Sequence, residues 1–327
     1  MVIKMTERER FIRALKREKV DGLVPHFELV FFLTMEAIGR VHPSHRNYFQ
    51  WDQMSASEKK AQIHDQALCY TEIAEKYNHS AIFVHPNPGP IGEICYDTES
   101  IKAILSEIRE ISGDQYFLMI HGDPTFPIPD GNGIMEFTEL MFEHHGVIHD
   151  ESKRNVERQA ALAKAFENTG LLDGFALCSD YCFNSNPFYS PELFDEFITP
   201  YLSGSIANNR SMGYYSIKHT DGNIMPILDR LVAAKPDALH SLDPQGGVSL
   251  TEVGERYGDK VCLIGNVNCG LLQTGTDGEV IADVKRSLAE GAKFPGYIFS
   301  TSNCAYTGLP LERYELMNKI WRNYEQH

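Results

Sequence analysis

The chain contains no low-complexity stretch, no internal repeat and no obvious linker, and its apolar runs are short. The most apolar ones, such as Leu29 to Leu33, are far below the roughly 20 residues that a membrane-spanning helix needs. The stretch from Met1 to Arg10 is charged and lacks an apolar segment of the signal-peptide type. These absences predict a cytoplasmic protein that does not use a membrane as a partner.

Cysteine is scarce and irregularly placed. The seven cysteines are an odd number and show no C-x-x-C spacing, so they do not form the pattern of a disulfide framework. We expect reduced thiols, most of them packed like small hydrophobic residues. Cys269 and Cys304 differ because each follows a strand-like run. The five expected to be buried are Cys69, Cys95, Cys178, Cys182 and Cys262.

Positive charge is also in short supply, with 30 Lys and Arg against 45 Asp and Glu and a formal net charge of -15. No basic cluster offsets this balance, so phosphate backbones and anionic lipids would be repelled. The sequence also lacks a P-loop, a GxGxxG fingerprint, an HExxH helix and a G-x-S-x-G elbow. Nucleic-acid binding, nucleotide-dependent chemistry and serine hydrolysis are therefore disfavoured.

What the chain does have is enough apolar residue for one large core, at 43% of 327 residues. Thr6 to Glu9 reads T-x-x-E, which is a capping box, and Phe11, Ile12 and Leu15 follow at helical spacing. We expect a helix here that covers one end of the molecule. The prediction is a single domain over residues 1–327 with this helix as an N-terminal extension.

Short apolar runs alternate with longer amphipathic stretches, the pattern of parallel strands with crossover helices. The eight strand-like runs are Leu23–Phe27, Ser80–Val84, Tyr116–Ile120, Gly174–Cys178, Tyr214–Lys218, Ala238–Leu242, Val261–Gly265 and Gly296–Ser300. Helices are expected at Ala56–Tyr77, Ser152–Asn168, Pro191–Asn209, Ile224–Ala234, Asp277–Glu290 and Pro310–Tyr324. Eight such units predict an α/β fold of the (β/α)8 TIM-barrel type.

A polar or ionisable residue directly follows every run. In a (β/α)8 barrel these positions face one pocket at the carboxyl ends of the strands, where active sites of this fold lie. Any one of them alone would be read as a capped turn or a satisfied core residue, but all eight together indicate a site. The residues are Glu28, His85, His121 with Asp123, Asp180 with Tyr181, His219 with Asp221, Asp243, Asn266 and Cys304.

The segment Lys218–Asn223 is the strongest local signal. His219 and Asp221 are two residues apart and would point the same way from a strand end, while Cys304 could bring a thiolate to the same centre. A His, an Asp and a Cys form a three-ligand zinc set that leaves a fourth position for substrate. The alternative is that Asp221 caps the helix beginning near Ile224 and that His219 contacts substrate without a metal.

Other positions leave two interpretations open. Asp180 is a candidate general base or substrate anchor, or simply a loop cap. Asn266 could orient a substrate or satisfy loop backbone. Glu28 and His85 are candidates by position alone.

Several motifs spread over nearly the whole chain belong together. They are Thr6–Arg10 with Asp21 and Pro25, Ser190–Phe194 leading to Pro200–Tyr201, His219–Asn223, Gly265–Val267 with Gly275–Thr276, and Gly296–Ile298 before Cys304. In these motifs the chain resembles the uroporphyrinogen decarboxylase superfamily, whose members include decarboxylases and methyltransferases that work with corrinoid proteins. The resemblance implies a (β/α)8 barrel, in agreement with the strand count.

Within that superfamily the residues differ from those of the founding decarboxylase. Its pattern implies an Arg-rich stretch after the first strand, yet residues 25–39 here contain neither Arg nor Lys. Its catalytic Asp after the second strand is replaced by Val84-His85-Pro86-Asn87, and its His-containing segment after the last strand by Ser302-Asn303-Cys304. A substrate dense in carboxylates would find no counter-charge.

The site residues are more similar to those of the zinc-dependent corrinoid methyltransferases. That branch implies an H-x-C motif with a second Cys after the last strand; His219 and Cys304 match it, and Asp221 stands in place of the first Cys. A carboxylate is a competent ligand, and a zinc with fewer thiolates is a harder Lewis acid. This departure favours an oxygen-bearing substrate over a thiol.

The resemblance thus implies a methyltransferase of the O-demethylase type. It would move a methyl group from a small methylated donor, such as a methoxylated aromatic, to the cobalt of a corrinoid (cobalamin-type) cofactor on a partner protein. The sequence is compatible with a homodimer. The catalytic candidates are Asp180, His219 and Tyr181; the substrate-binding candidates are Glu28, His85, His121 and Asn266; the zinc ligands are His219, Asp221 and Cys304.

Two rival functions stay open. One is a metal-independent decarboxylase or lyase of the same fold acting on a small carboxylated substrate, with His219 and Asp180 as acid and base. The other is a binding protein that holds a small ligand in the same pocket. Bound zinc would count against the first, and methyl transfer against the second.

Overall fold

The computed structural model describes residues 5–46, 50–85 and 98–324. Its strands form one sheet in which every pair of neighbours is parallel and the spatial order follows the chain order. The seven strands are β1 Ala81–Val84, β2 Phe117–His121, β3 Gly174–Cys178, β4 Tyr215–His219, β5 Ala238–His240, β6 Cys262–Ile264 and β7 Tyr297–Ile298.

The segment around His26 closes this sheet into a barrel. His26 forms parallel bridges with His79, before β1, and with Phe299, after β7. The amide of Phe27 donates to the carbonyl of Phe299 at 3.0 Å, and the amide of Ser80 donates to the carbonyl of His26 at 2.6 Å. This segment takes the place of the first predicted run, and the other seven runs agree with strands to within two residues. The predicted (β/α)8 barrel is confirmed.

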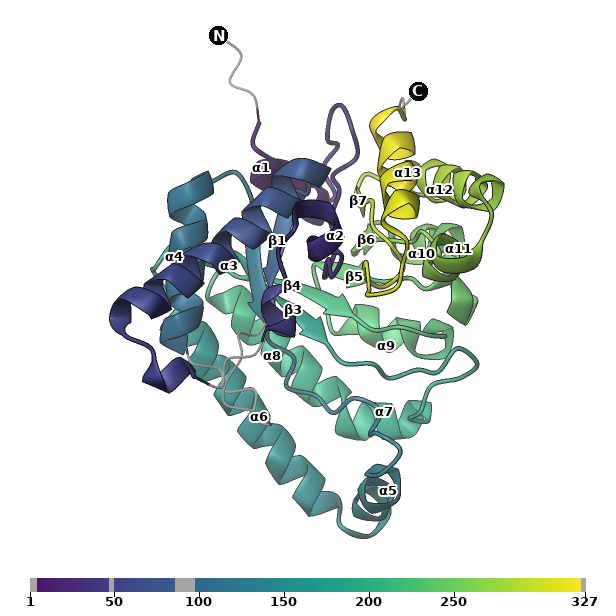
Figure 1. Cartoon of the computed structure of the whole chain (residues 1–327). Helices are drawn as coiled ribbons and strands as arrows, with labels where there is room; N and C mark the ends of the chain where they lie inside the picture. The colour runs from purple at the N-terminus through teal and green to yellow at the C-terminus, as the bar shows by residue number, and fades with distance from the viewer. Residues whose placement is uncertain (1–4, 47–49, 86–97, 325–327) are drawn as a thin grey trace.

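The helices surround the strands, and α5 with the amino end of α6 projects furthest from them (Figure 1). The α-helices are α1 Glu7–Leu15, α2 Thr34–Ile38, α3 Ala56–Tyr77, α4 Thr98–Ser112, α5 Ile134–Glu143, α6 His145–Ala165, α7 Pro191–Phe197, α8 Thr199–Ser211, α9 Leu228–Ala233, α10 Leu250–Tyr257, α11 Cys269–Thr274, α12 Asp277–Gly291 and α13 Leu311–Arg322. Within the described ranges, four short 3-10 turns are Pro43–His45, Trp51–Gln53, Met225–Ile227 and Pro244–Gly246.

Helix α6 begins at His145, seven residues before the predicted start at Ser152, and ends at Ala165. The other predicted helices differ from the structure by more than two residues only where proline intervenes. The bounds of α3 are those predicted. The stretch expected as a single helix over Pro191–Asn209 is two helices, α7 and α8, that meet at Ile198. Pro200 explains the break, because it has no amide hydrogen to donate and its ring would clash with the carbonyl four residues earlier. Pro226 similarly confines the start of the next predicted helix to a 3-10 turn before α9.

The apolar core has two layers that follow from strand alternation. Side chains of one parity fill the barrel interior, including Ala176 and Ile217, whereas those of the other parity, such as Phe175 and Leu177, pack between the strands and the helices. A residue two positions after Ile217 therefore returns to the inner face. This parity decides which strand-end residues can reach the mouth of the barrel.

Helix α1 covers the amino-terminal end of the barrel. Its capping box is present, with the Thr6 side chain accepting from the backbone of Glu9. Phe11 is fully buried, and its ring centroid lies 5.7 Å from that of Phe27 and 4.8 Å from that of Phe117. The opposite end of the barrel is left to the loops that follow the strands.

The described cysteines are free thiols. Cys69, Cys182 and Cys262 are buried as predicted, Cys178 is only partly buried, and Cys95 lies outside the described residues. Within the described ranges, no helix is long and apolar enough to cross a membrane.

Candidate active site

Strand register brings three side chains together at the carboxyl ends of β3, β4 and β5. Cys178 is the cross-strand partner of His219, and His219 is the partner of His240. Because Ile217 lies in the interior cluster, His219 points to the same inner face. These residues form the floor of the barrel mouth.

Above this floor, His219 meets two carboxylates. Its Nε2 lies 3.9 Å from Oδ1 of Asp180 and 3.8 Å from Oδ1 of Asp221. One ligand-type atom from each of the three residues lies within 4.8 Å of the others. The His219 side chain is 8% exposed, that of Asp221 is 23% and that of Asp180 is 51%. The imidazole is thus the most buried of the three side chains, and the two carboxylates lie between it and the solvent.

Asp221 is fixed by neighbours from three strands. Its Oδ1 accepts from the Ser241 hydroxyl at 2.6 Å, its Oδ2 accepts from the Asn303 amide, and its own backbone amide donates to Asp180 at 3.0 Å. In the 3-10 turn after Ile224, the amide of Met225 donates to the side chain of Asn223 at 3.2 Å and not to Asp221, so the alternative interpretation of Asp221 as a helix cap was wrong. Asp180 does cap the loop that carries Asp221.

Burial sets the electrostatics of this carboxylate. It raises the pKa of Asp221 above 3.8; Asp180 and Asp243 add to the rise, while His219 and Ser241 oppose it. A cation placed among these groups would relieve both the desolvation and the repulsion between the carboxylates.

His240 lies directly beneath His219. The two Nδ1 atoms are 2.8 Å apart, and Nε2 of His240 is 3.4 Å from the Ser300 hydroxyl. Burial, with His219 nearby, lowers the pKa of His240 well below its usual value. His240 falls within an apolar strand-like run, so sequence reasoning does not single it out. Its parity with Ala238, an interior residue, was the signal that could have found it.

A buried ion pair lies on the outer side of the same strand ends. Nζ of Lys218 is 2.7 Å from Oδ2 of Asp123, and both side chains are fully buried. The ammonium lies 4.2 Å from the ring centroid of Tyr181, whose hydroxyl is 2.5 Å from that of Thr125. Tyr181, a candidate catalytic residue, is itself fully buried. In this structure its ring supports the floor, and its role in catalysis stays a prediction.

Two of the predicted substrate-binding residues are engaged by the protein. Both oxygens of buried Glu28 accept from Thr301, at 3.2 Å from the amide and 2.6 Å from the hydroxyl. Asn266 is buried, donates to the carbonyl of Leu242 at 2.8 Å and accepts from Arg286 at 3.1 Å. Of the two interpretations left open for Asn266, the contacts favour the satisfaction of loop backbone.

The other two predicted substrate-binding residues, His121 and His85, lie further round the mouth of the barrel. Nε2 of His121 is 3.2 Å from the carbonyl of Cys178, and burial lowers the pKa of this imidazole. His85 follows β1, with ring centroids 5.5 Å from Phe83 and 6.3 Å from Phe32. Both are partly buried, and their contact with substrate remains a prediction.

Cys304 is at the same end of the barrel but outside the group around His219. Its side chain is partly buried, and burial raises the pKa of its thiol. Its carbonyl accepts from the Cys269 thiol at 3.8 Å. Across the part of the chain that the structure describes, the ligand-type group at the mouth contains Asp180 in place of Cys304. The structure therefore brings together two of the three predicted zinc ligands.

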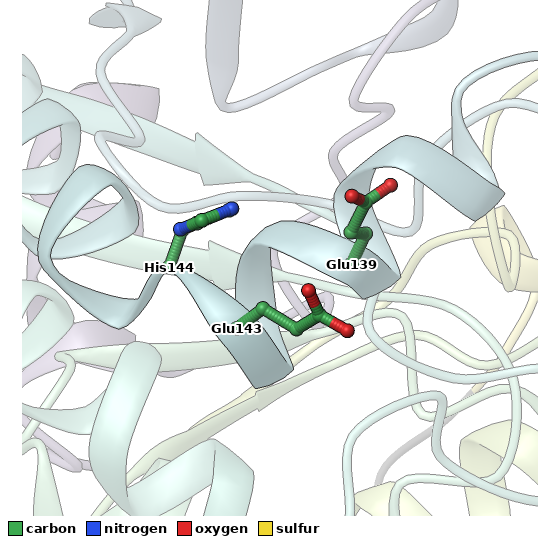
Figure 2. Close-up of side chains that lie close together, drawn as sticks. All are labelled: Glu139, Glu143 and His144. Atoms are coloured by element: carbon green, nitrogen blue, oxygen red, sulfur yellow. The ribbon is translucent and has the colours of Figure 1, made fainter.

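A second group of metal-type side chains lies on the projecting α5–α6 corner. Figure 2 shows Glu139 and Glu143 one turn apart on α5, with His144 where α6 begins. Their ligand-type atoms lie within 4.8 Å of one another, but all three residues are exposed. Solvated carboxylates are ordinary on protein surfaces, and we assign this group no metal-binding role.

Comparison with known proteins identifies the family of this chain. The family model described as "Uroporphyrinogen decarboxylase (URO-D)" matches residues 133–324, a stretch that contains Asp180, His219, Asp221 and Cys304. No curated protein matches the chain by sequence.

Solved structures with the same fold include three that extend over nearly the whole chain. A methyltransferase from Methanosarcina mazei has a TM-score of 0.72 at 18% identity and covers 97% of this chain and 98% of its own. A β-mannanase from the blue mussel Mytilus edulis has 0.51 at 10%, covering 93% of each chain. A putative vitamin-B12-independent methionine synthase from Listeria monocytogenes has 0.50 at 12%, covering 92% and 98%. At these identities the matches show a shared fold.

Proposed function

Because the chain belongs to the uroporphyrinogen decarboxylase family, we propose that it is an enzyme of that fold which transfers a methyl group from a small methylated compound, such as a methoxylated aromatic, to a corrinoid protein. The observation that carries the proposal is the convergence of Asp180, His219 and Asp221 at the mouth of the barrel. The match of the whole fold to the Methanosarcina mazei methyltransferase supports it.

The donor set fits a divalent cation. Two carboxylates and one imidazole converge, and the other nitrogen of His219 is hydrogen-bonded to His240, which is how proteins orient a metal-bound histidine. Zinc would be held here by His219, Asp221 and Asp180. The sequence predicts Cys304 as the third ligand in place of Asp180, and that ligand stays a prediction. Bound zinc would act as a Lewis acid on the ether oxygen of the donor.

The charge of the mouth favours a donor without multiple carboxylates. The carboxylates of Asp180, Asp221 and Asp243 all lie there, and burial raises the pKa of Asp243 as well. A polycarboxylate substrate such as that of the founding decarboxylase would be repelled. Asp180, which is about half exposed at 51%, lies at the outer edge of the site, where it would orient the donor if Cys304 is the third zinc ligand. The corrinoid would enter from solvent on its partner protein.

The first experiment is elemental analysis of the purified protein and of three variants. We expect about one zinc per chain in the wild type, as in mononuclear catalytic sites, and its loss in His219→Ala. The metal content of Asp180→Ala and of Cys304→Ala decides which residue is the third ligand. Because Asp180 lies within 4.8 Å of the other ligand atoms, we expect the metal to be lost in Asp180→Ala. Retention there with loss in Cys304→Ala would restore the ligand set predicted from the sequence.

Activity is measured as methylation of reduced cobalamin, followed by its absorbance. Methoxylated aromatics should be turned over faster than methylated thiols, because a site rich in carboxylates makes a harder Lewis acid. Faster turnover of the thiols would reject the oxygen-donor proposal. No methyl transfer to reduced cobalamin or to corrinoid proteins from either donor class would reject the methyltransferase.

The same geometry also favours one alternative. Asp221 already accepts hydrogen bonds from Ser241 and Asn303. His219 lies within 3.9 Å of Asp180, so His219 and Asp180 could serve as acid and base in a metal-independent decarboxylase or lyase. Wild type purified without metal that releases carbon dioxide from a small carboxylated substrate would establish this alternative.

A further inference from the structure

Exposed apolar side chains are concentrated at one end of the barrel. Among the large ones that are exposed within the described ranges, all but Ile111 lie on connections that leave the strands at the mouth. Ile111 lies on the last turn of α4, at the opposite end. Groups of exposed apolar side chains mark surfaces that contact a partner. Those on the mouth side are Met35, Val41, Met135, Phe142, Val147 and Phe183.

Helix α5 presents two of these side chains along one stripe. Met135 and Phe142 are seven residues apart, a spacing that returns a helix to the same face, and they are 79% and 62% exposed. The opposite face of α5 is anchored, because Met141 is buried and the ring centroid of Phe137 lies 5.4 Å from that of Phe126. The inner face thus holds α5 in place while the outer stripe faces solvent.

Aromatic rings connect α5 to the edge of the candidate site. The ring centroid of Phe188 lies 6.5 Å from that of Phe137 on α5 and 6.4 Å from that of Phe183. Phe183 is 49% exposed, and its carbonyl accepts from the amide of Asn223 at 2.9 Å. The apolar surface therefore runs from α5 to the loop that carries Asp221.

The outer side of α5 is also acidic. Glu136, Glu139 and Glu143 are all exposed there, and residues 110–152 contain neither Lys nor Arg. A second copy of the chain that docked through the same patch would place acid against acid, and anionic lipid would be repelled as well. The surface fits a protein whose apolar contact region is rimmed by Lys and Arg.

We propose that the arm surface, defined by Met135, Glu139, Phe142 and Phe183, docks the corrinoid partner protein, which contacts it with apolar residues surrounded by basic ones. This inference rests on the proposed function, in which a corrinoid protein brings its cobalt to the mouth. Met and Phe supply the apolar centre of the contact, and the glutamates set how fast the partner docks. Docking beside the mouth leaves the candidate site accessible to the donor and to the cobalt.

The test measures methyl transfer from a methoxylated aromatic to two kinds of acceptor, free reduced cobalamin and the reduced corrinoid proteins purified from the organism that encodes the chain. Phe142→Ala should raise KM for the corrinoid protein about 10-fold or more, as loss of a central interface side chain does. Ile111→Ala is the matched control at the opposite end of the barrel and should leave that KM within about twofold of wild type.

Charge reversal tests the acidic part of the arm surface. Glu139→Lys should raise KM for the corrinoid protein at low salt, and the difference from wild type should shrink as ionic strength rises, because salt screens exposed charges. Glu110→Lys, also at an exposed position, is the control beside Ile111 and should not change KM.

Turnover of free cobalamin separates docking from chemistry, since this small acceptor needs no docking surface. It should be the same in wild type and in all four variants. An unchanged KM for the corrinoid protein in Phe142→Ala and Glu139→Lys would overturn the docking surface, as would methylation of free cobalamin with no methylation of any corrinoid protein; in both cases the methyl transfer itself stands. Methylation of neither acceptor would reject the proposed function and this inference with it.

Sedimentation of the wild type checks the other occupant. We expect no dimer that depends on the arm surface. A dimer that dissociates in Phe142→Ala would show that a second copy of the chain occupies this surface in place of the corrinoid protein.

Discussion

At the scale of single residues, Lys218 shows how the barrel accommodates a charge in its wall. Its ammonium is fully buried and is neutralised by Asp123, and it also donates to the carbonyls of Leu177 at 3.2 Å and Ser179 at 3.0 Å. The face of the Tyr181 ring adds a cation–π contact. This network ties β2, β3 and β4 together immediately before the residues of the candidate site.

Breaking the ion pair from one side should be costly. Lys218→Met leaves the carboxylate of Asp123 buried without a partner, and we expect a loss of about 3–5 kcal/mol in the free energy of unfolding, measured by urea denaturation at pH 7. The matched control is Lys218→Met with Asp123→Leu, which removes both charges and should recover much of that loss. A double variant no more stable than the single one would contradict this explanation.

The cost of Lys218→Met should also depend on pH. Burial would raise the pKa of Asp123, but Lys218 and Thr125 hold it below 3.8; the pairing therefore contributes stability above that value and loses it as the pH falls through the lowered pKa. Without Lys218 the buried carboxyl should protonate at higher pH. The difference in unfolding free energy between wild type and variant should shrink from pH 7 to pH 4, and a constant difference would show that the charge is not responsible.

At the scale of elements, the loops after β3, β4 and β5 contact one another through glycine. Gly222 has a φ of +76°, and a Cβ there would lie 2.6 Å from the carbonyl oxygen of Cys182 and 2.7 Å from that of Phe183. A Cβ on Gly246 would lie 2.3 Å from the carbonyl carbon of Gly222. These contacts hold the loop that carries Asp221 against its neighbours on both sides.

Gly222→Ala should therefore disturb the site as well as the fold. Gly213→Ala is the matched control, since its φ is +85° and a Cβ there meets nothing within 4 Å. The control should lose only about 1 kcal/mol of unfolding free energy, the cost of a side chain in this backbone conformation. Gly222→Ala should lose more unfolding free energy and bind zinc more weakly. The measurements are urea denaturation and zinc titration; equal losses in the two variants would mean that loop contact is unimportant.

At the scale of the whole molecule, the barrel has a closed end and an open end. Helix α1 covers the amino-terminal end, where Arg8 pairs with Asp173 at 2.6 Å and Arg109 from α4 pairs with the same carboxylate at 2.8 Å. Phe11 fills the space above the first interior layer. The packing around α1 and the candidate site thus lie at opposite ends of the barrel.

Opening the closed end should destabilise the molecule without touching the candidate site. Phe11→Ala removes a fully buried ring, and we expect a loss of about 3–5 kcal/mol in unfolding free energy. Phe142→Ala on α5, whose side chain is 62% exposed, should change it by less than about 0.5 kcal/mol. Zinc affinity of the folded Phe11→Ala protein should equal that of wild type; a decrease would show that the two ends are coupled.

The sequence by itself determined the elements of this protein. The periodicity of strands and helices and the capping box at Thr6 are local properties. The barrel and the ring of strand-end residues could therefore be predicted from them. The same local reasoning missed the break at Ile198, because helical periodicity outweighed Pro200 in the prediction.

Only the tertiary structure decided which side chains meet. The register that places His240 beside His219, and the closure that brings Ser300 beneath them, depend on pairing between strands far apart in the chain. For the same reason Asp180 joins His219 and Asp221 while the Cys304 sulfur does not. Sequence spacing sets the direction of a side chain from its own strand, whereas its neighbours are set by the twist and packing of the whole barrel.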